Sequence, residues 1–210
     1  MSRQSAAHAG LAVFYPIVPD AAWLARLAAL GVKTIQLRVK DAAPDVVARE
    51  IAASLDICRR RRCQLIVNDH WRAALAAGAD FVHLGQEDLA AADVAALKAA
   101  GVRLGISTHH PEELAIALAA QPDYVALGPI YETRLKVMKW APHGLDRIAD
   151  WRRRIGVLPL VAIGGLTPER ADAVLGAGAD SLAVVTDFIT HPDPEARVRQ
   201  WLDLTRRYVA

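Results

Sequence analysis

Two carboxylates in the sequence are spaced so that they could share a metal ion. Asp69 comes just after the apolar run at 64–67, and Asp88 comes after the next apolar run, at 81–84. If the two runs are neighbouring parallel strands, both carboxylates lie at the same edge of the sheet. Mg2+ typically takes one or two protein carboxylates and completes its ligand set with water and substrate phosphates. The competing interpretation is that each Asp only caps the helix that follows it.

Cationic residues occur at matching positions after other apolar runs. Arg38 and Lys40 follow the second run, and because side chains on an extended chain alternate, they lie on the same side as Gln36. Lys136 belongs to the loop after the sixth run. Single exposed cations are common and carry little information. Next to two carboxylates, however, they favour a site for a metal-bound polyphosphate.

A glycine pair indicates a second anion site. Gly164 and Gly165 follow the apolar run at 158–163, and Thr186 follows the last run. Consecutive glycines expose backbone N–H groups, and the loops after the last two strands of a (β/α)8 barrel commonly bind phosphate. A plain tight turn is the alternative. Asp187 lies beside Thr186 and would repel a phosphate unless its side chain points away.

Three histidines lack the pattern of a metal site or a nucleophile. His70, His109 and His110 follow apolar runs, but none has His-x-x-x-His or Cys-x-x-Cys spacing. We expect each of them to cap a helix or to make a hydrogen bond.

These residues can come together only on a scaffold in which many strand ends meet. The sequence has a pattern that predicts such a scaffold. Short runs rich in Val, Ile and Leu alternate with segments whose apolar residues recur at helical spacing. Eight strands alternating with helices predict an α/β protein, a single (β/α)8 TIM barrel. The competing fold, a doubly wound open sheet, has a glycine-rich signature after its first strand that is absent here. We predict strands at 11–18, 34–37, 64–67, 81–84, 103–106, 124–127, 158–163 and 182–185, and helices at 21–30, 46–61, 89–100, 112–119, 145–154, 168–175 and 195–208.

Glycines stand at the ends of several predicted helices. Gly31, Gly78 and Gly178 each separate a helical segment from the next strand. Because Gly adopts the left-handed conformation of a helix C-cap without steric cost, we expect positive φ at all three. The strand at 158–163 is apolar throughout rather than alternating, which predicts a parallel sheet buried on both faces.

The composition bounds the class of protein. The 210 residues are 53% hydrophobic and carry a formal net charge of +2, which predicts one domain over residues 1–210, with 1–9 as a flexible N-terminal extension. No run approaches the roughly 20 apolar residues of a membrane helix, and two cysteines, Cys58 and Cys63, make no disulfide framework. The basic run at 59–62 lies at a predicted helix C-terminus, where cations suit the helix dipole. We therefore expect a cytoplasmic protein that binds neither nucleic acid nor membrane.

Six stretches of the chain together resemble the thiamine phosphate synthase family, in the same order and at family-like spacing. The most specific is His-Leu-Gly-Gln-Glu-Asp at 83–88, whereas a double glycine is shared by many phosphate-binding barrels. The matching stretches are residues 36–40, 67–70, 78–88, 105–109, 128–131 with Lys136, and 162–165.

The resemblance implies a reaction and a cofactor. The protein would join 4-amino-2-methyl-5-hydroxymethylpyrimidine diphosphate to hydroxyethylthiazole phosphate, or to its carboxylated form, giving thiamine phosphate and pyrophosphate. Mg2+ would be the cofactor. The pyrimidine would leave as a stabilised cation in a dissociative step, so the main catalytic task is to stabilise the departing diphosphate.

The resemblance also implies roles for individual residues. Asp69 and Asp88 would hold Mg2+, and Gln36 would contact the pyrimidine. The pyrophosphate would be bound by Arg38, Lys40, Asn68, Ser107 and Lys136, and of these Arg38, Lys40, Ser107 and Lys136 would be catalytic. The thiazole phosphate would be held by Thr133, Gly165, Val185 and Thr186.

The loop after the sixth strand departs from the family pattern. Glu132 replaces a proline and Leu135 replaces a hydroxyl residue, so we expect a weaker affinity for thiazole phosphate. Two alternatives share the barrel and its phosphate site. One is a thiazole tautomerase-type homologue, which does not need the diphosphate residues, and the other is a non-catalytic thiazole phosphate sensor. The expected partners are small-molecule substrates, and the sequence leaves a homo-oligomer open.

Overall fold

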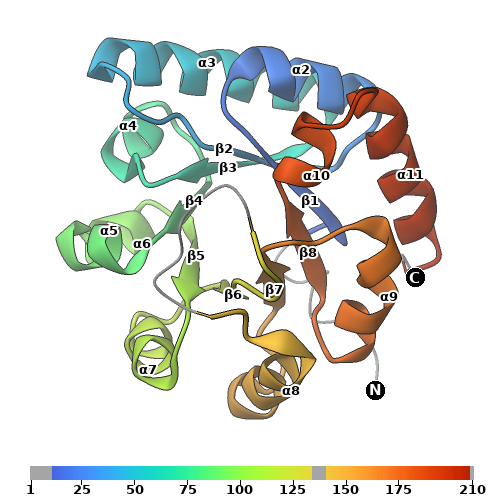
Figure 1. Ribbon diagram of the computed structural model, residues 1–210. Coiled ribbons are helices and arrows are strands. Elements are labelled where there is room, and N and C mark those ends of the chain that lie inside the picture. Colours follow the sequence, from blue (N-terminus) through green and yellow to red (C-terminus); the bar gives the residue numbers. More distant parts are fainter. Residues whose placement is uncertain (1–10, 134–140, 209–210) are drawn as a thin grey trace.

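Eight parallel strands close into a barrel in which each strand pairs with its neighbours in the sequence (Figure 1). The structure is a computed structural model, and it describes residues 11–133 and 141–208. Because β8 pairs with β1, the sheet has no open edge, and the predicted (β/α)8 barrel is confirmed. The strands are β1 (Phe14–Val18), β2 (Thr34–Leu37), β3 (Gln64–Asn68), β4 (Phe81–Leu84), β5 (Arg103–Thr108), β6 (Tyr124–Leu127), β7 (Leu160–Ile163) and β8 (Ser181–Val184).

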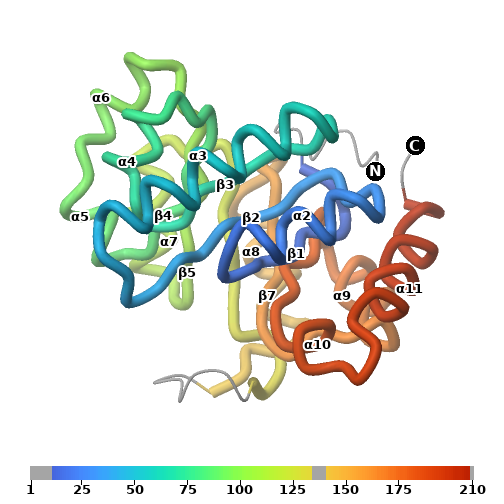
Figure 2. Tube along the Cα trace, turned by 90° about the horizontal axis from the view of Figure 1, so that it is seen from above, coloured from blue at the N-terminus to red at the C-terminus, as the bar shows by residue number. Residues whose placement is uncertain are grey.

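Helices connect the strands and form a ring around the barrel (Figure 1). They are α2 (Ala21–Ala29), α3 (Pro44–Arg61), α4 (Trp71–Ala76), α5 (Gln86–Ala91), α6 (Val94–Ala99), α7 (Pro111–Ala119), α8 (Gly144–Ile155), α9 (Pro168–Gly176), α10 (Thr186–Ile189) and α11 (Pro194–Arg206). Figure 2 shows α4, α5 and α6 grouped at one side of the molecule and α9, α10 and α11 at the other. Among the described helices, none combines the length and the apolar character needed to cross a membrane.

The barrel interior and the layer between barrel and helices are separate apolar cores. Tyr15, Ile66, Phe81, Tyr124 and Val161 contribute to the interior. The other strand side chains pack against the surrounding helices. Both faces of each strand are therefore buried, which explains why the strand segments are apolar at nearly every position. Two tyrosine hydroxyls in the interior require polar partners there.

The predicted helix at 89–100 is wrong, because two helices occupy this segment. Helix α5 ends at Ala91, and Asp93 begins α6 by accepting a hydrogen bond from the Ala96 N–H at 2.9 Å. An Asp side chain that caps a new helix interrupts an apolar pattern that would otherwise continue. Helices α4 and α10 have no counterpart among the predicted elements, because six and four residues are too short to establish a helical period.

The glycines at three helix ends adopt the predicted left-handed conformation. The φ angle is +92° at Gly31, +72° at Gly78 and +118° at Gly178. A residue with a Cβ is strained at such angles, so glycine lets the chain leave each helix and turn into the next strand.

The two cysteines lie together where α3 leads into β3, at the end of the barrel opposite the carboxyl ends of the strands. Both are free thiols, and the Sγ atoms of Cys58 and Cys63 are 3.0 Å apart. They are thus remote from the rim that carries the predicted site. The predicted flexible extension at 1–9 lies outside the described residues.

Candidate active site

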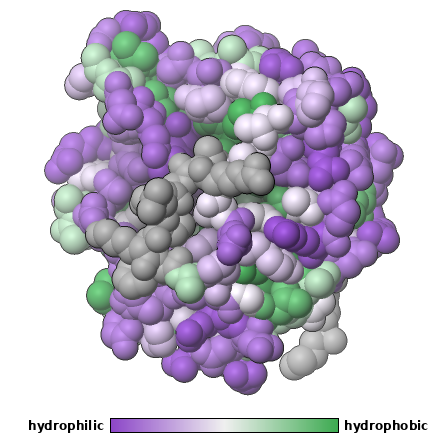
Figure 3. All heavy atoms as spheres, in the orientation of Figure 1, coloured by the Kyte–Doolittle hydropathy of each residue, from purple (hydrophilic) through white to green (hydrophobic). Residues whose placement is uncertain are grey.

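The carboxyl ends of the strands bring the predicted site residues to one rim of the barrel. Gln36 lies in β2, Asn68 is the last residue of β3, and Ser107 lies in β5. Gly165 follows β7 and Thr186 follows β8. Figure 3 shows the molecule in the orientation of Figure 1, with hydrophilic residues over much of the visible face and smaller hydrophobic patches between them.

Asp69 and Asp88 face each other across the ends of β3 and β4. The Asp69 N–H donates to the His83 carbonyl at 2.9 Å, and the backbone of Asp69 has a φ of +61°. Asp88 lies within α5, and the two side chains are close enough to share a hydrogen bond. The N-cap of α4 is His70 and the N-cap of α5 is Gly85, so the alternative that these Asp side chains cap the following helices is wrong.

The electrostatics of this pair fit a divalent cation. Burial raises the pKa of Asp69, and the Asp88 carboxylate raises it further, while the charge of Arg38 and a hydrogen bond from Asn68 lower it by less. A cation between the two carboxylates would relieve their repulsion. Among the described residues, no group of three or more His, Cys, Asp or Glu side chains could form a metal site. Two carboxylates are within the number of protein ligands that Mg2+ typically takes.

Arg38 follows β2 directly, and its charge acts on this pair. Its backbone N–H donates to the Val18 carbonyl at 2.8 Å, which extends the pairing of β1 and β2 by one residue. Its charge acts on both Asp69 and His83. Lys40 is exposed two residues further on. Lys136 lies outside the described residues.

Ser107 lies at one end of a chain of hydrogen bonds that runs through the barrel interior. The Ser107 Oγ is 2.8 Å from His83 Nε2, and His83 Nδ1 is 2.7 Å from the Tyr124 hydroxyl. The Tyr124 hydroxyl is 2.9 Å from that of Tyr15, to which Gln36 Nε2 donates at 2.7 Å. The chain therefore joins two predicted site residues, Gln36 and Ser107, through three residues that the sequence analysis misses. A histidine inside the apolar segment of β4 is the signal that could have revealed it.

Burial fixes the protonation of this chain. It lowers the pKa of His83 to about 3, with a further contribution from the charge of Arg38. It also raises the pKa of the Tyr15 and Tyr124 hydroxyls. The imidazole and both phenols are therefore neutral near neutral pH, and His83 carries one proton on its ring.

Gly105 makes room for the chain. His83, Gly105 and Tyr124 are register partners on three consecutive strands. A Cβ on Gly105 would lie 2.1 Å from the Tyr124 ring, so a larger residue there would displace the ring. The Tyr124 ring thus crosses β5 and stacks on the His83 ring, with centroids 5.5 Å apart.

The glycine pair after β7 packs against the loop after β6. Gly164 has a φ of +103°, and a Cβ there would lie 2.7 Å from Pro129. A Cβ on Gly165 would lie 2.4 Å from the Glu132 carbonyl oxygen. The loop that carries Thr133 therefore depends on both glycines for its close approach. The Gly165 carbonyl accepts from Arg170 at 2.6 Å, so the glycine is also tied to α9.

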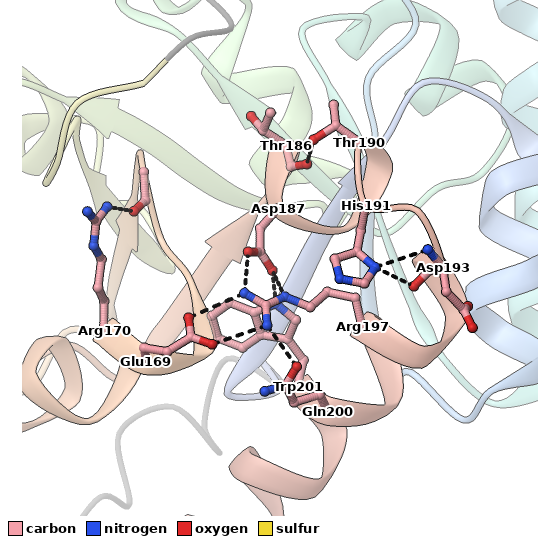
Figure 4. A network of polar contacts seen from close by, with 11 residues as sticks. Glu169, Arg170, Thr186, Asp187, Thr190, His191, Asp193, Arg197, Gln200 and Trp201 are labelled. Carbon is pink, nitrogen blue, oxygen red and sulfur yellow. Dashed lines mark hydrogen bonds and ion pairs between the residues drawn. The ribbon is translucent and has the colours of Figure 1, made fainter.

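Asp187 points away from the phosphate site predicted at Thr186 (Figure 4). Its carboxylate accepts two hydrogen bonds from the Arg197 guanidinium, at 2.8 and 2.9 Å, and a third from the Trp201 indole at 2.7 Å.

Arg197 also bonds to Glu169. Hydrogen bonds, from Thr167 and then Arg197, lower the pKa of Glu169 to about 2. This network, which we call the Arg197 clamp, joins the starts of α9 and α10 to α11. It neutralises Asp187, while Val185 and Thr186 form the turn into α10.

The three histidines of the loops make hydrogen bonds, as predicted. His70 Nε2 is 2.9 Å from the Val39 carbonyl. His109 Nδ1 is 2.7 Å from Glu113, and His110 also contacts acidic side chains of α7.

Comparisons with known proteins find relatives over most of the chain. Residues 14–188 match the model of a family described as thiamine monophosphate synthase. The thiamine-phosphate synthase of Rhizobium etli is 61% identical over 192 residues, which cover 91% of this chain and 94% of that protein. The thiamine-phosphate synthase of Neisseria meningitidis serogroup B is 47% identical over 186 residues, covering 89% of this chain and 91% of that one.

A solved structure supports the fold independently. A thiamine phosphate pyrophosphorylase from Pyrococcus furiosus aligns with a TM-score of 0.83, covering 97% of this chain and 100% of that chain. At 24% identity, this likeness bears on the fold alone.

Proposed function

The chain belongs to the thiamine monophosphate synthase family and is an enzyme of that kind, and we propose a specific reaction for it. It joins 4-amino-2-methyl-5-hydroxymethylpyrimidine diphosphate to hydroxyethylthiazole phosphate and releases pyrophosphate; with the carboxylated thiazole phosphate as substrate, the carboxyl group would leave in addition as carbon dioxide. The relatives named above, at 61% and 47% identity over most of the chain, support the synthase activity.

One observation carries the choice of a diphosphate substrate. Two carboxylates, Asp69 and Asp88, face each other at the rim, and their proximity and burial raise the pKa of Asp69. Holding two such groups together without a cation is costly, so their arrangement supports a site for a metal-bound anion. Arg38 and Asn68 act on the same carboxylate, which supports a role for this region in binding the diphosphate.

The proposed pyrophosphate half of the site consists of Arg38, Asn68, Asp69, Asp88 and Ser107, with Lys40 and Lys136 from the neighbouring loops. Asp69 and Asp88 would hold Mg2+, and the bound ion would supply positive charge next to the diphosphate. Arg38, Lys40, Ser107 and Lys136 would donate hydrogen bonds to the phosphate oxygens. These donors act most strongly as the leaving oxygen gains charge, which makes them catalytic.

The proposed chemistry is dissociative. The bond between the pyrimidine methylene carbon and the diphosphate oxygen breaks, and its electron pair leaves with the oxygen. The ring amino group donates electron density to the resulting cation. The thiazole nitrogen then supplies the electron pair of the new C–N bond. No side chain has to act as a covalent nucleophile, because the charge of the departing diphosphate is the main barrier.

The proposed phosphate cup consists of Gly165, Val185 and Thr186, with Thr133 from the loop after β6. It would hold the thiazole phosphate through backbone N–H groups and hydroxyls. Fixing a remote phosphate orients the thiazole nitrogen toward the pyrimidine and removes much of the entropic cost of bringing two substrates together. The Arg197 clamp supports this proposal, because it holds the carboxylate of Asp187 away from Thr186.

The experiment mixes purified protein with the pyrimidine diphosphate, thiazole phosphate and Mg2+, and measures thiamine phosphate by its fluorescent oxidation product. We expect product that disappears when EDTA is added in excess of Mg2+ and returns when Mg2+ is restored. No product, together with tight binding of thiazole phosphate, would contradict the proposal and favour the tautomerase-type homologue or the sensor. Release of one pyrophosphate per thiamine phosphate identifies the leaving group.

A further inference from the structure

The hydrogen-bond chain from Gln36 to Ser107 can be followed one hydrogen at a time. Each of the two phenols has one hydrogen to donate, neutral His83 has one, and Ser107 has one. Gln36 is 3% exposed, Tyr15 1% and Tyr124 0%. Bulk water therefore does not reach these hydroxyls, and an unmade hydrogen bond here is costly.

When Gln36 donates to Tyr15, one arrangement gives every bond in the chain a donor and an acceptor. Tyr15 then donates to Tyr124, and Tyr124 donates to His83 Nδ1. His83 must carry its proton on Nε2, from which it donates to the Ser107 Oγ. The Ser107 hydroxyl hydrogen is left for an acceptor outside the chain, such as a phosphate oxygen.

The same heavy-atom positions allow one opposite arrangement. If the Gln36 amide turns over, its Oε1 accepts from Tyr15 and every other bond in the chain reverses. Ser107 then donates its hydrogen to His83 Nε2, and the hydroxyl can no longer donate to an anion. The atom of Gln36 that faces Tyr15 thus decides whether Ser107 donates inward or outward.

A ligand at Gln36 selects between the two arrangements. An aminopyrimidine has an amino group that donates, and it is bound by Oε1 of an amide. A ligand that holds Oε1 leaves Nε2 to face Tyr15, which is the arrangement in the structure. Binding of such a ring therefore favours the state in which Ser107 donates outward.

On the basis of the proposed function, we propose that Tyr15, Tyr124 and His83 form a relay that couples pyrimidine binding at Gln36 to pyrophosphate binding at Ser107. The three are positioning residues, since they act on substrate only through Gln36 and Ser107. Bound pyrimidine would favour the arrangement in which Ser107 donates its hydrogen to the leaving group. A free diphosphate without the pyrimidine would meet a weaker site.

Calorimetry measures this coupling without turnover. Inorganic pyrophosphate is titrated into the protein in Mg2+, with and without saturating 4-amino-5-hydroxymethyl-2-methylpyrimidine. This pyrimidine alcohol is uncharged, so it cannot attract pyrophosphate by charge. We expect it to lower the pyrophosphate dissociation constant about tenfold, the lower end of the range for one hydrogen bond to a charged group.

The Tyr124→Phe variant interrupts the relay and keeps the ring that stacks on His83. We expect it to bind each ligand alone but to lose the coupling, so that the ratio of the two dissociation constants falls to about 1. Tyr208→Phe is the matched control, because the Tyr208 hydroxyl bonds to Asp172, outside the relay. It should keep the wild-type ratio. Coupling that persists in Tyr124→Phe would overturn the relay.

The tautomer of His83 provides a second test, which is measured on the wild-type protein. The relay predicts that the nitrogen-15 shifts of the wild-type pyrimidine complex show a proton on Nε2 and none on Nδ1, with His83→Gln used to assign the signal. A proton on Nδ1 would contradict it.

The proposed function can fail separately. If the wild type forms no thiamine phosphate, that proposal falls, whereas turnover without coupling removes only the relay.

Discussion

In the proposed site, the rim around β2 to β5 would bind through side chains, whereas the rim around β7 and β8 would bind through backbone and hydroxyl groups. The pyrophosphate half rests on buried polar groups inside the barrel, including His83 and Asn68. The phosphate cup rests on close backbone packing at Gly164 and Gly165, and its supporting ion pairs lie outside the barrel, in the Arg197 clamp.

The difference follows from what each half is proposed to do. Stabilising a leaving diphosphate requires charges and donors held rigidly where charge develops, and a dry, low-dielectric interior strengthens them. Capturing a phosphate that does not react requires only orientation, which a fixed backbone provides. Changes in the first half should therefore lower the maximal rate, and changes in the second should raise the concentration of thiazole phosphate needed to reach it.

The largest effect is expected from changes to the proposed metal ligands. Asp69→Ala and Asp88→Ala should each lower kcat about 100-fold or more, because the charge that stabilises the leaving group is lost, and should raise the Mg2+ concentration for half-maximal rate. Steady-state rates across a Mg2+ series measure both quantities. Glu87→Ala, an exposed neighbour in α5, is the control and should behave as wild type. If both Asp variants retain the wild-type kcat and Mg2+ dependence, these residues are not the metal ligands.

The burial of His83 should also make the free energy of unfolding depend on pH. Because burial lowers the pKa of His83 from 6.5 to about 3, the unfolded chain binds a proton that the folded chain does not. The contribution of His83 is complete above about pH 6.5 and is lost as pH falls toward 3. Between pH 7 and pH 5 it should remove about 2 kcal/mol from the unfolding free energy.

Urea unfolding at a series of pH values measures this contribution. The His83→Gln variant lacks the titrating ring and keeps an amide near the position of Nε2, so its stability should fall less steeply over the same interval. Parallel pH profiles for the two proteins would mean that His83 is not buried in its neutral form.

A smaller effect is expected from the Arg197 clamp. Arg197→Met leaves Asp187 without its positively charged partner next to the phosphate cup, where side-chain exposure is 14% for Arg197 and 9% for Asp187. Like charges near the surface repel by about 1–4 kcal/mol, so KM for thiazole phosphate should rise about tenfold while kcat changes little. The double variant Asp187→Asn with Arg197→Met removes both charges and should recover part of the lost affinity. If the double variant is no better than Arg197→Met alone, the released carboxylate is not the cause.

The smallest expected effect concerns the loop after β6. Leu135, which lies outside the described residues, stands where the family has a hydroxyl residue, so Leu135→Thr should lower KM for thiazole phosphate about threefold by restoring one hydrogen bond. Val157→Thr is the control, because Val157 is 85% exposed at the opposite end of β7. An unchanged KM in Leu135→Thr would show that the missing hydroxyl does not weaken this substrate.

The sequence predicts the scaffold better than the connections between side chains. Strand positions follow from short apolar runs, and the runs end where polar residues such as Asn68 and Ser107 begin the rim. The break between α5 and α6 depends on one capping residue, Asp93, and periodicity alone does not show it. The Asp69 and Asp88 pair could be expected from strand order, because neighbouring parallel strands end side by side.

The relay and the Arg197 clamp could not be predicted from the sequence. The contact between Tyr124 and His83 depends on Gly105 leaving space on the strand between them, which is a property of packing in three dimensions. The direction of Asp187 depends on Arg197 and Trp201, both on a helix that follows. In each case the partner lies on another element, and the identity of the residue alone does not reveal it.

The most direct test of the division between the two halves is a set of three saturation curves. Thiamine phosphate formation is measured against thiazole phosphate concentration, at saturating pyrimidine diphosphate and Mg2+, for wild type, Asp88→Ala and Arg197→Met. The account predicts that Arg197→Met reaches the wild-type plateau at a higher concentration. It also predicts that Asp88→Ala reaches a much lower plateau at an unchanged midpoint. The division would be contradicted if both variants lowered the plateau, or if both raised the midpoint, relative to wild type.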